Sequence, residues 1–362
     1  MSNRKKIIIS CGGTGGHIFP GIEIANAIKA IDSSLDILFV GAKNKMEMSE
    51  VPKAGFPIKG LWIQGFNRTK PSKNILLPIK LFHSIIYSIF LLYFHRPIAV
   101  IGTGGFASGP ILFSSAMLGF STYIQEQNFT PGFTNKLLSY LVKKVFVAYD
   151  GMNKFFPDKK IYKQGNPVRQ TLKQTSKSKS DAKLFFNLKN NYTTVLVMGG
   201  SLGAEPINCV IQDNIKVLLN NNIQLIWQTG KVHHKKYQHL QSDNCSLYKF
   251  IHNMDLAYLA ADIVISRAGA IAISEICFLE KASIIIPSPH VTANHQYYNA
   301  KYLENHGACI MIEEYNLDKL LIDSIFILKV GENRKTISKK ANMLFNYNAA
   351  SKISNIIIKD IK

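Results

Sequence analysis

The stretch that decides the fold is Gly12-Gly13-Thr14-Gly15-Gly16-His17, which follows the apolar run 6–10 after a single residue. A β-branched run, then glycines, then a helical pattern is typical of a strand, a tight turn and a helix N-terminus. Such a turn exposes backbone N–H groups at the positive end of a helix dipole, which suits phosphate. The stretch therefore predicts an α/β fold with an anion site at its first turn.

The same arrangement occurs twice more along the chain. Gly102-Thr103-Gly104-Gly105 follows the apolar run 98–101, and Gly199-Gly200-Ser201-Leu202-Gly203 follows the run 194–198. Strand-like runs alternate with helical stretches from end to end, which indicates βαβ units and parallel sheets. Because two loops lie early and one lies past the middle, we expect two nucleotide-fold domains that face each other.

A turn at Gly165-Asn166-Pro167-Val168, followed by the polar run 173–181, predicts the boundary between these domains. We expect an N-terminal Rossmann-like domain over 1–166 and a C-terminal one over 167–335. A helix is expected over 336–362 and could pack back on the N-terminal domain. The 362 residues, 47% hydrophobic and 18% charged, suffice for two folded cores.

The net charge of +20 suggests an anionic partner, although abundant lysine can also reflect composition alone. The five cysteines are widely spaced and contain no C-x-x-C, which predicts neither a disulfide framework nor a zinc site. There is no D-x-D pair and no His/Cys cluster with ligand spacing, so no metal or other cofactor is expected.

The glycine loops do not match the common nucleotide motifs well. No Walker A sequence occurs, and the first loop has Ile18 where a dinucleotide fingerprint needs glycine or alanine. The second loop matches formally as Gly102-x-Gly104-x-x-Ala107, with Glu126 at the expected distance. This match leaves open a nicotinamide-dependent oxidoreductase, or a loop that lets a bulky substrate approach the backbone.

The segment 75–94 is nearly all apolar and about as long as the roughly 20 residues that span a bilayer. Pro78 is expected to break the helix early, and Lys80 and His83 interrupt the apolar run. The pattern favours a half-inserted helix on an anionic membrane surface, with a buried core helix and a true membrane span as the alternatives.

Polar residues at three helix starts suggest chemistry. His17 can act as a general base at neutral pH, or merely cap or pack against its helix. Glu275 can accept hydrogen bonds from two ribose hydroxyls, or simply interact with the helix dipole or form an ion pair with Arg267. The amides of Asn294 and Gln296 can recognise sugar hydroxyls.

Eight motifs occur in one order: GGTGGHIFPG (12–21), GTGGFASGP (102–110), QEQN (125–128), GNPVR (165–169), GGSLGA (199–204), FIHNM (250–254), SRAGAIAISEI (266–276) and HQYYNA (295–300). Together they resemble the MurG family of bacterial enzymes. These enzymes transfer N-acetylglucosamine from UDP-N-acetylglucosamine to undecaprenyl-pyrophosphoryl-N-acetylmuramoyl-pentapeptide. The resemblance implies the glycosyltransferase B fold, two Rossmann-like domains with a cleft between them, and inversion at the anomeric carbon.

The resemblance also implies site residues. His17 becomes the candidate base, with Glu126 as the alternative, and Gln125 stands where many members carry histidine. The implied contacts to UDP-N-acetylglucosamine are Thr14, Gly15, Gly16, Asn128, Arg169, Ser201, the backbone of Ile251, Ala270, Ile271, Ala272, Ile273, Ser274, Glu275 and Gln296. The implied contacts to the acceptor pyrophosphate are Gly13, Gly104 and Gly105.

The family docks on the cytoplasmic face of the inner membrane through an apolar patch with basic residues. The matching positions are Lys73, Ile75, Leu76, Leu77, Ile79, Lys80 and Phe82. The expected partners are the sugar donor, the lipid-linked acceptor, an anionic membrane surface and cell-wall synthesis proteins, but not nucleic acid. A UDP-N-acetylglucosamine 2-epimerase, a glycolipid glycosyltransferase and a non-catalytic membrane scaffold are the alternatives.

Overall fold

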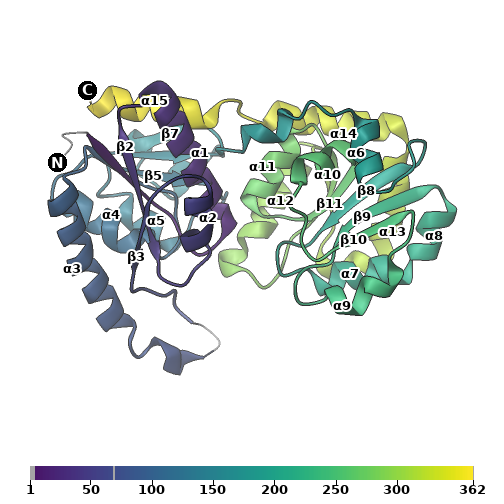
Figure 1. Cartoon of the computed structure of the whole chain (residues 1–362), viewed down its shortest axis with the longest axis horizontal. Helices are drawn as coiled ribbons and strands as arrows, with labels where there is room; N and C mark the ends of the chain where they lie inside the picture. The colour runs from purple at the N-terminus through teal and green to yellow at the C-terminus, as the bar shows by residue number, and fades with distance from the viewer. Residues whose placement is uncertain (1–4, 68–69, 362) are drawn as a thin grey trace. The chain divides into compact units, whose positions relative to one another are not determined.

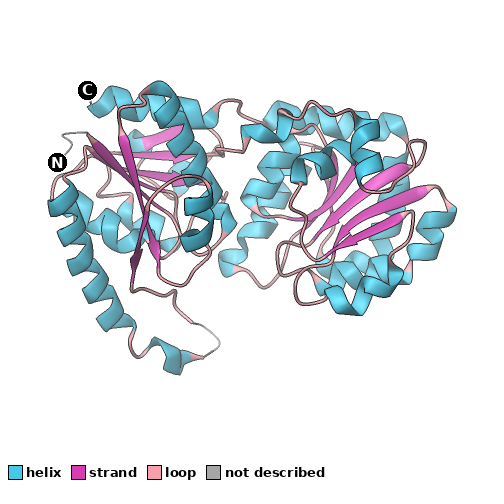
Figure 2. Cartoon of the chain, viewed as in Figure 1, coloured by secondary structure: helices cyan, strands magenta, loops and turns pink. Residues whose placement is uncertain are grey.

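The computed structural model describes residues 5–67 and 70–361, and the chain forms two compact units (Figure 1). The N-terminal unit comprises Met1–Val168 and Asn346–Lys362, and the C-terminal unit comprises Arg169–Phe345. In each unit, helices cover a parallel sheet (Figure 2). This is the strand–helix alternation that the sequence predicts.

The N-terminal unit contains a seven-stranded parallel sheet in the order β3-β2-β1-β4-β5-β6-β7. The three isoleucines of β1 and all of β4 are buried, because helices shield both faces of the central strands from water. The strands are β1 (Lys6–Ser10), β2 (Asp36–Ala42), β3 (Ile58–Leu61), β4 (Ala99–Gly102), β5 (Thr122–Glu126), β6 (Lys144–Val147) and β7 (Ile161–Lys163).

Six α-helices are described in the N-terminal unit: α1 (Gly15–Ile31), α2 (Glu47–Lys53), α3 (Leu77–His95), α4 (Ser108–Met117), α5 (Phe133–Leu138) and α15 (Ala349–Ile361). Three short 3-10 helices accompany them: η1 (Pro71–Asn74), η2 (Met152–Lys154) and η3 (Asp158–Lys160). Helix α15 packs against α1, and its Ile353 and Ile357 are fully buried in the core of this unit.

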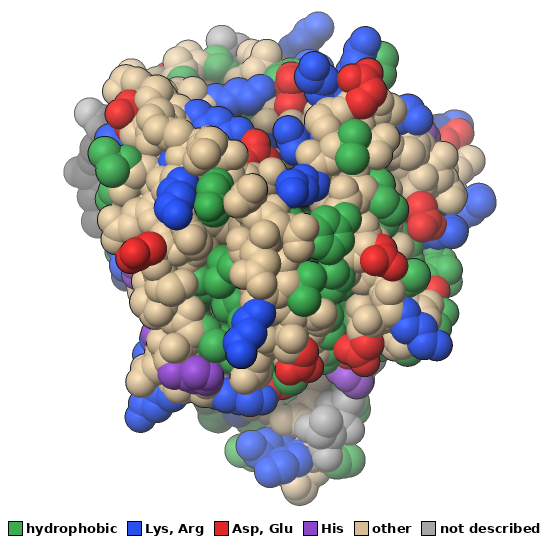
Figure 3. Space-filling view, turned by 90° about the vertical axis from the view of Figure 1, so that its right-hand side faces the viewer, with side chains coloured by type: hydrophobic (Ala, Val, Ile, Leu, Met, Phe, Trp, Pro, Cys, Tyr) green, Lys and Arg blue, Asp and Glu red, His purple; other side chains and the backbone are tan. Residues whose placement is uncertain are grey.

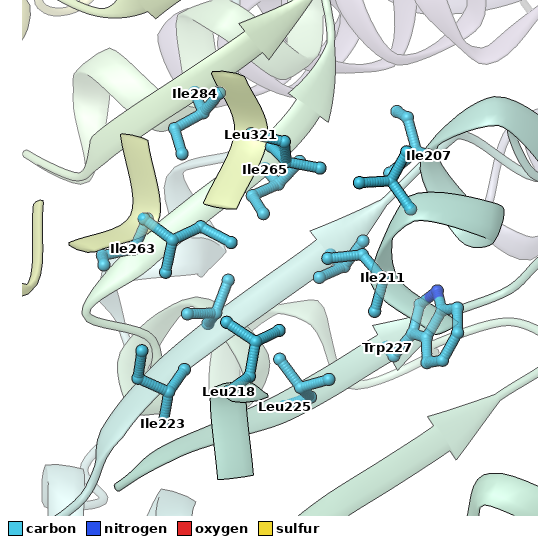
Figure 4. Packing of buried hydrophobic residues seen from close by; sticks show 14 of the residues in the cluster. Ile207, Ile211, Leu218, Ile223, Leu225, Trp227, Ile263, Ile265, Ile284 and Leu321 are labelled. Carbon is cyan, nitrogen blue, oxygen red and sulfur yellow. The ribbon is translucent and has the colours of Figure 1, made fainter. Parts of the chain in front are cut away.

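The C-terminal unit contains a six-stranded parallel sheet in the order β10-β9-β8-β11-β12-β13. The strands are β8 (Thr193–Met198), β9 (Ile223–Gln228), β10 (Cys245–Tyr248), β11 (Ile263–Arg267), β12 (Ala282–Ile286) and β13 (Ile310–Met311). Figure 4 shows part of the core, where Trp227 of β9 and Ile265 of β11 lie in one cluster with Ile211 of α7 (Glu205–Asp213).

The remaining α-helices of this unit are α6 (Lys179–Phe185), α8 (Ile215–Asn220), α9 (His234–Tyr237), α10 (Met254–Ala260), α11 (Ala270–Phe278), α12 (His295–Asn305), α13 (Leu317–Lys329) and α14 (Gly331–Leu344). Its 3-10 helices are η4 (Gln170–Lys173), η5 (Gln238–Leu240), η6 (Thr292–Asn294) and η7 (Glu314–Asn316).

On the face shown in Figure 3, basic and acidic side chains are interspersed.

The predicted single helix over 336–362 is wrong. Helix α14 ends at Leu344, Phe345 takes an extended conformation, and Asn348 has a left-handed backbone with φ of 61°. Asparagine tolerates this conformation, which no α-helix can continue through. The break sends α14 to the C-terminal unit and α15 to the N-terminal unit.

The predicted helix break at Pro78 is also wrong. Helix α3 begins at Leu77 and runs to His95, so Pro78 lies in its first turn. Backbone N–H groups in the first turn have no carbonyl partner within the helix, so the absence of this group in proline breaks no hydrogen bond. Nor is α3 a buried core helix, because its buried residues are only Ser84, Ser88, Leu91 and Leu92. Among the described residues, Pro71–His95 is the one helical segment long and apolar enough to cross a membrane, judged by length and composition alone.

Candidate functional site

Each sheet has one point where the strand order reverses, between β1 and β4 in the N-terminal unit and between β8 and β11 in the C-terminal unit. Ligands of open parallel sheets bind outside the carboxyl ends of the strands at such a point. The three glycine loops follow β1, β4 and β8. Topology therefore places all three at the positions where these sheets bind ligands.

The first two glycine loops lie against each other. Gly104 and Gly105 have φ of 100° and 83°, which favour glycine. A Cβ atom on Gly105 would lie 2.2 Å from the carbonyl oxygen of Gly12. The second loop thus needs glycine for backbone contact with the first loop, in addition to any contact with a ligand.

The amide of Gly13 is already bonded within the protein. Its N–H donates to Oε2 of Glu47 at 3.1 Å, and the N–H of Ala42 donates to Oε1 of the same carboxylate at 2.9 Å. Glu47 is fully buried. This geometry argues against the expected contact between the Gly13 amide and the acceptor pyrophosphate, and it identifies a carboxylate that no motif in the sequence pointed to.

His17 is the third residue of α1 and is half-buried between the two loops. Its Nδ1 lies 3.2 Å from Oγ1 of Thr14, and its carbonyl accepts a hydrogen bond from Oγ1 of Thr103 at 2.7 Å. A Cβ atom on Gly104 would lie 2.7 Å from the imidazole Cδ2. The fold therefore brings together His17, Thr14 and the second loop.

Glu126, the alternative base, is buried and holds a loop together. Its Oε1 accepts from the backbone N–H and the side-chain amide of Asn128, at 3.0 and 3.1 Å. Its Oε2 accepts from the N–H of Gly132 and the amide of Asn135, at 3.2 and 2.8 Å. Both carboxylate oxygens of Glu126 are thus engaged in holding this loop.

The C-terminal unit has a hollow of about 570 Å³ at its strand reversal. Three of the expected donor contacts, Ser201, Ala272 and Gln296, line it together with the third glycine loop. Helices α7 and α11 begin beside it, and their exposed N–H groups and dipoles favour an anion there. Ile271 and Ile273 are buried and do not line the hollow.

Gln228 is a second residue that the sequence analysis missed. Its Nε2 donates to the carbonyl of Gly200 at 2.9 Å, and its Oε1 accepts from the N–H of Ile251 at 2.9 Å. The side chain lines the hollow and joins the third glycine loop to Ile251, whose backbone is an expected contact to UDP-N-acetylglucosamine. The N–H of Ile251 is therefore already bonded within the protein.

Glu275 is buried beside Arg169 and does not appear among the residues that line the hollow. Arg169 Nη2 lies 2.8 Å from Oε1 of Glu275, and the Tyr258 hydroxyl donates to Oε2 at 3.4 Å. Burial raises the pKa of Glu275, and Arg169 opposes this shift. The predicted alternative pairing with Arg267 is wrong, because Arg267 pairs with Glu314.

The described residues contain no group of three or more His, Cys, Asp or Glu side chains that could hold a metal ion. The five cysteines are free thiols.

The chain matches two family models. The glycosyltransferase family 28 N-terminal domain matches residues 7–147, and the family 28 C-terminal domain matches residues 194–355. The glycosyltransferase B-like fold with two parallel-sheet α/β domains is thereby confirmed.

Curated relatives narrow the family. A protein of Flavobacterium psychrophilum is 45% identical over 98% of this chain and 97% of its own length, and one of Parabacteroides distasonis is 43% identical over 98% of each. Both are named UDP-N-acetylglucosamine--N-acetylmuramyl-(pentapeptide) pyrophosphoryl-undecaprenol N-acetylglucosamine transferase. The crystal structure of Acinetobacter baumannii MurG superimposes with a TM-score of 0.76 at 25% identity, covering 98% of this chain and 99% of that one. The chain belongs to the MurG family of glycosyltransferases.

The fold extends to other enzymes. UDP-N-acetylglucosamine 2-epimerase of Neisseria meningitidis superimposes with a TM-score of 0.67 at 14% identity, covering 98% of this chain and 100% of that one. This likeness is one of fold alone, and the family membership sets aside the nicotinamide-dependent oxidoreductase and the non-catalytic scaffold.

Proposed function

We propose that this chain transfers N-acetylglucosamine from UDP-N-acetylglucosamine to the C4 hydroxyl of lipid-linked N-acetylmuramoyl-pentapeptide. This is the last cytoplasmic step of peptidoglycan precursor synthesis. The observation that carries the proposal is near-full-length identity of 41–45% to several relatives whose names state this transfer. The anion-binding geometry at the strand reversals supports it.

In the proposed mechanism, His17 removes the proton from the acceptor hydroxyl as its oxygen attacks the anomeric carbon of the donor. The new C–O bond forms as the bond between the anomeric carbon and the β-phosphate oxygen of UDP breaks, so the anomeric configuration inverts. Negative charge grows on UDP and is stabilised by Ser201 and by the N–H groups at the start of α11. Thr14 supports His17 through its hydrogen bond to Nδ1.

The donor site proper is assigned to the C-terminal unit. Ser201 and the start of α11 lie at the hollow and suit the pyrophosphate, while Gln296 suits the sugar. Glu275 is assigned to the ribose hydroxyls. These hydroxyls would donate to the same carboxylate that Arg169 and Tyr258 contact.

We also propose that α3 docks peripherally on the cytoplasmic face of the inner membrane. The expected residues Ile75, Leu76, Ile79 and Phe82 are all exposed, whereas Leu77 is half-buried. Lys73 is exposed, but the Lys80 ammonium is tied to Oε1 of Gln64 at 2.6 Å. The exposed apolar surface continues past the predicted patch through Ile86, Phe90, Tyr93 and Phe94. Cell-wall synthesis proteins stay a prediction as partners.

The test is UDP release from UDP-N-acetylglucosamine in the presence and absence of the undecaprenyl-linked acceptor in detergent. We expect UDP only when the acceptor is present, together with a disaccharide product. UDP release or epimerised sugar without the acceptor would support the 2-epimerase instead. No turnover across a range of detergents would refute the transfer.

A further inference from the structure

Glu47 lies beneath the first glycine loop as a fully buried carboxylate. It is the first residue of α2, and its two oxygens accept the N–H groups of Gly13 and Ala42. A buried carboxylate is costly unless each oxygen is hydrogen-bonded. The proposed mechanism does not use this charge, so its place in the fold needs another explanation.

The surrounding backbone is shaped to admit this side chain. A Cβ atom on Gly12 would lie 2.7 Å from Oε1 of Glu47, and one on Gly41 would lie 2.5 Å from its Cγ. Glycine at both positions leaves the space that the carboxylate occupies. The first loop is therefore built around an anion supplied by the protein itself.

The residue next to Gly13 connects this anion to the candidate base. The carbonyl of Thr14 accepts from the N–H groups of His17 and Ile18, at 3.1 and 3.2 Å, and its hydroxyl contacts Nδ1 of His17. The carbonyl of Thr14, which lies two peptide units beyond the N–H that Glu47 holds, thus sets where α1 starts, and the Thr14 hydroxyl sets where the imidazole lies.

We propose that Glu47 is a positioning residue for acceptor transfer, which acts by fixing the first glycine loop beneath Thr14 and His17. The inference rests on the proposed function. The Gly13 amide is committed to Glu47, so the acceptor anion meets the amides at the start of α1 and the second loop instead.

The chemistry requires a carboxylate in particular. The two N–H donors reach different oxygens, and glutamine offers only one acceptor, with an NH₂ group in place of the other. Glu47→Gln therefore breaks one of the two hydrogen bonds without changing side-chain size. Glu50→Gln is the matched control, because Glu50 lies on the same helix and its carboxylate pairs with Lys53 at 2.7 Å.

The kinetic test uses the full-length enzyme with UDP-N-acetylglucosamine and the lipid-linked acceptor. We expect E47Q to lower kcat/KM for the acceptor by about tenfold to a hundredfold, the scale of a slightly misplaced catalytic group. Binding of UDP measured by calorimetry should stay unchanged, and E50Q should stay within about twofold of wild type. In a His17→Ala background, E47Q should add less than about twofold, because Glu47 acts through His17. A full additive loss there would overturn the proposal.

A second measurement does not depend on turnover. Amide hydrogen exchange at Gly13 or at Ala42 should be about tenfold faster in E47Q than in wild type or E50Q, because one of these two N–H groups loses its acceptor. Unchanged exchange would overturn the role of Glu47 even if activity falls. If the wild type shows no transfer, the proposed function fails while the exchange result still decides the role of Glu47. Should E47Q not fold, E47D keeps both acceptors on a shorter arm and is subjected to the same two measurements.

Discussion

Arg169 and Glu275 form a largely buried ion pair in the C-terminal unit, with 2.8 Å between Nη2 and Oε1. The carboxylate is the less exposed partner, with 6% of its side chain accessible against 28% for the arginine. Burial raises the pKa of Glu275, and the guanidinium is the largest influence in the other direction. The residue proposed to hold the ribose therefore depends on Arg169 for its charge.

Arg169→Leu should make stability depend more strongly on pH. Without the cation, the pKa of Glu275 rises further above its unfolded value. A carboxyl group with a raised pKa stabilises the fold below its unfolded pKa, and this contribution is lost as pH rises through the folded pKa. We expect a destabilisation of about 1–3 kcal/mol at pH 8, discounted for the exposed part of Arg169, and a smaller one at pH 5.

Denaturant melts of wild type and Arg169→Leu at both pH values test this. Arg334→Leu is the control, because the Arg334 side chain donates to the carbonyls of Leu328 and Lys329. Its effect should be the same at both pH values. Equal losses at pH 5 and pH 8 for R169L would contradict the coupling.

His17→Ala should lower kcat by about two to four decades, the usual range for a lost general base, with little change in KM for UDP-N-acetylglucosamine. Steady-state kinetics with both substrates varied test this, with the exposed His239→Ala as control. A loss below about tenfold would remove His17 as the base.

Gln228→Leu should weaken donor binding, because it breaks both hydrogen bonds that join Gly200 to Ile251. We expect KM for UDP-N-acetylglucosamine to rise about tenfold, on the scale of one or two buried hydrogen bonds, with a smaller change in kcat. The exposed Gln238→Leu should leave both constants unchanged. A variant with normal UDP affinity by calorimetry would show that Gln228 is not needed for donor binding.

Phe82→Glu combined with Phe90→Glu should release the protein from anionic vesicles. Both rings are exposed on α3, at 68% and 58%, and burying an aromatic ring in lipid contributes about 1.5–3 kcal/mol. Vesicle co-sedimentation should fall at least tenfold while UDP affinity is retained. Leu320→Glu on α13 of the C-terminal unit is the control. Undiminished sedimentation would rule out α3 as the docking surface.

Gly105→Ala should destabilise the N-terminal unit by about 2–4 kcal/mol, since φ of 83° is strained for alanine and the new Cβ would meet the carbonyl of Gly12. Gly132→Ala is the control, because its φ is −64° and open space surrounds it. Thermal melts of both variants measure the difference. Similar melting temperatures for the two would show that the loop contact is dispensable.

Much of the fold followed from local patterns in the sequence. Runs such as 263–266 are recognisable as strands because they are rich in β-branched residues. A strand that is shielded from water on both faces does not need to alternate apolar and polar residues. Glycines directly after such runs predicted turns suited to anions, and the ordered motifs predicted the family. The two errors, at Pro78 and in the tail, have one cause. A proline near a helix end can either break the helix or be tolerated in its first turn, and an asparagine can either continue a helix or end it, and the sequence alone does not distinguish these outcomes.

What the sequence by itself determined was therefore the strand–helix order, the three glycine loops and the family. Only the tertiary structure decided the polar partners of two of those loops, Gly13 with Glu47 and Gly200 with Gln228. It also decided that Glu275 of α11 pairs with Arg169 rather than Arg267. In the sequence, Gly13 and Glu47 are 34 residues apart, Gly200 and Gln228 are 28 apart, and Arg169 and Glu275 are 106 apart. The order of the strands brings residues that are distant in the sequence next to each other. A buried polar group is stable only when it has a hydrogen-bond partner, so its partner depends on which residues the fold places beside it.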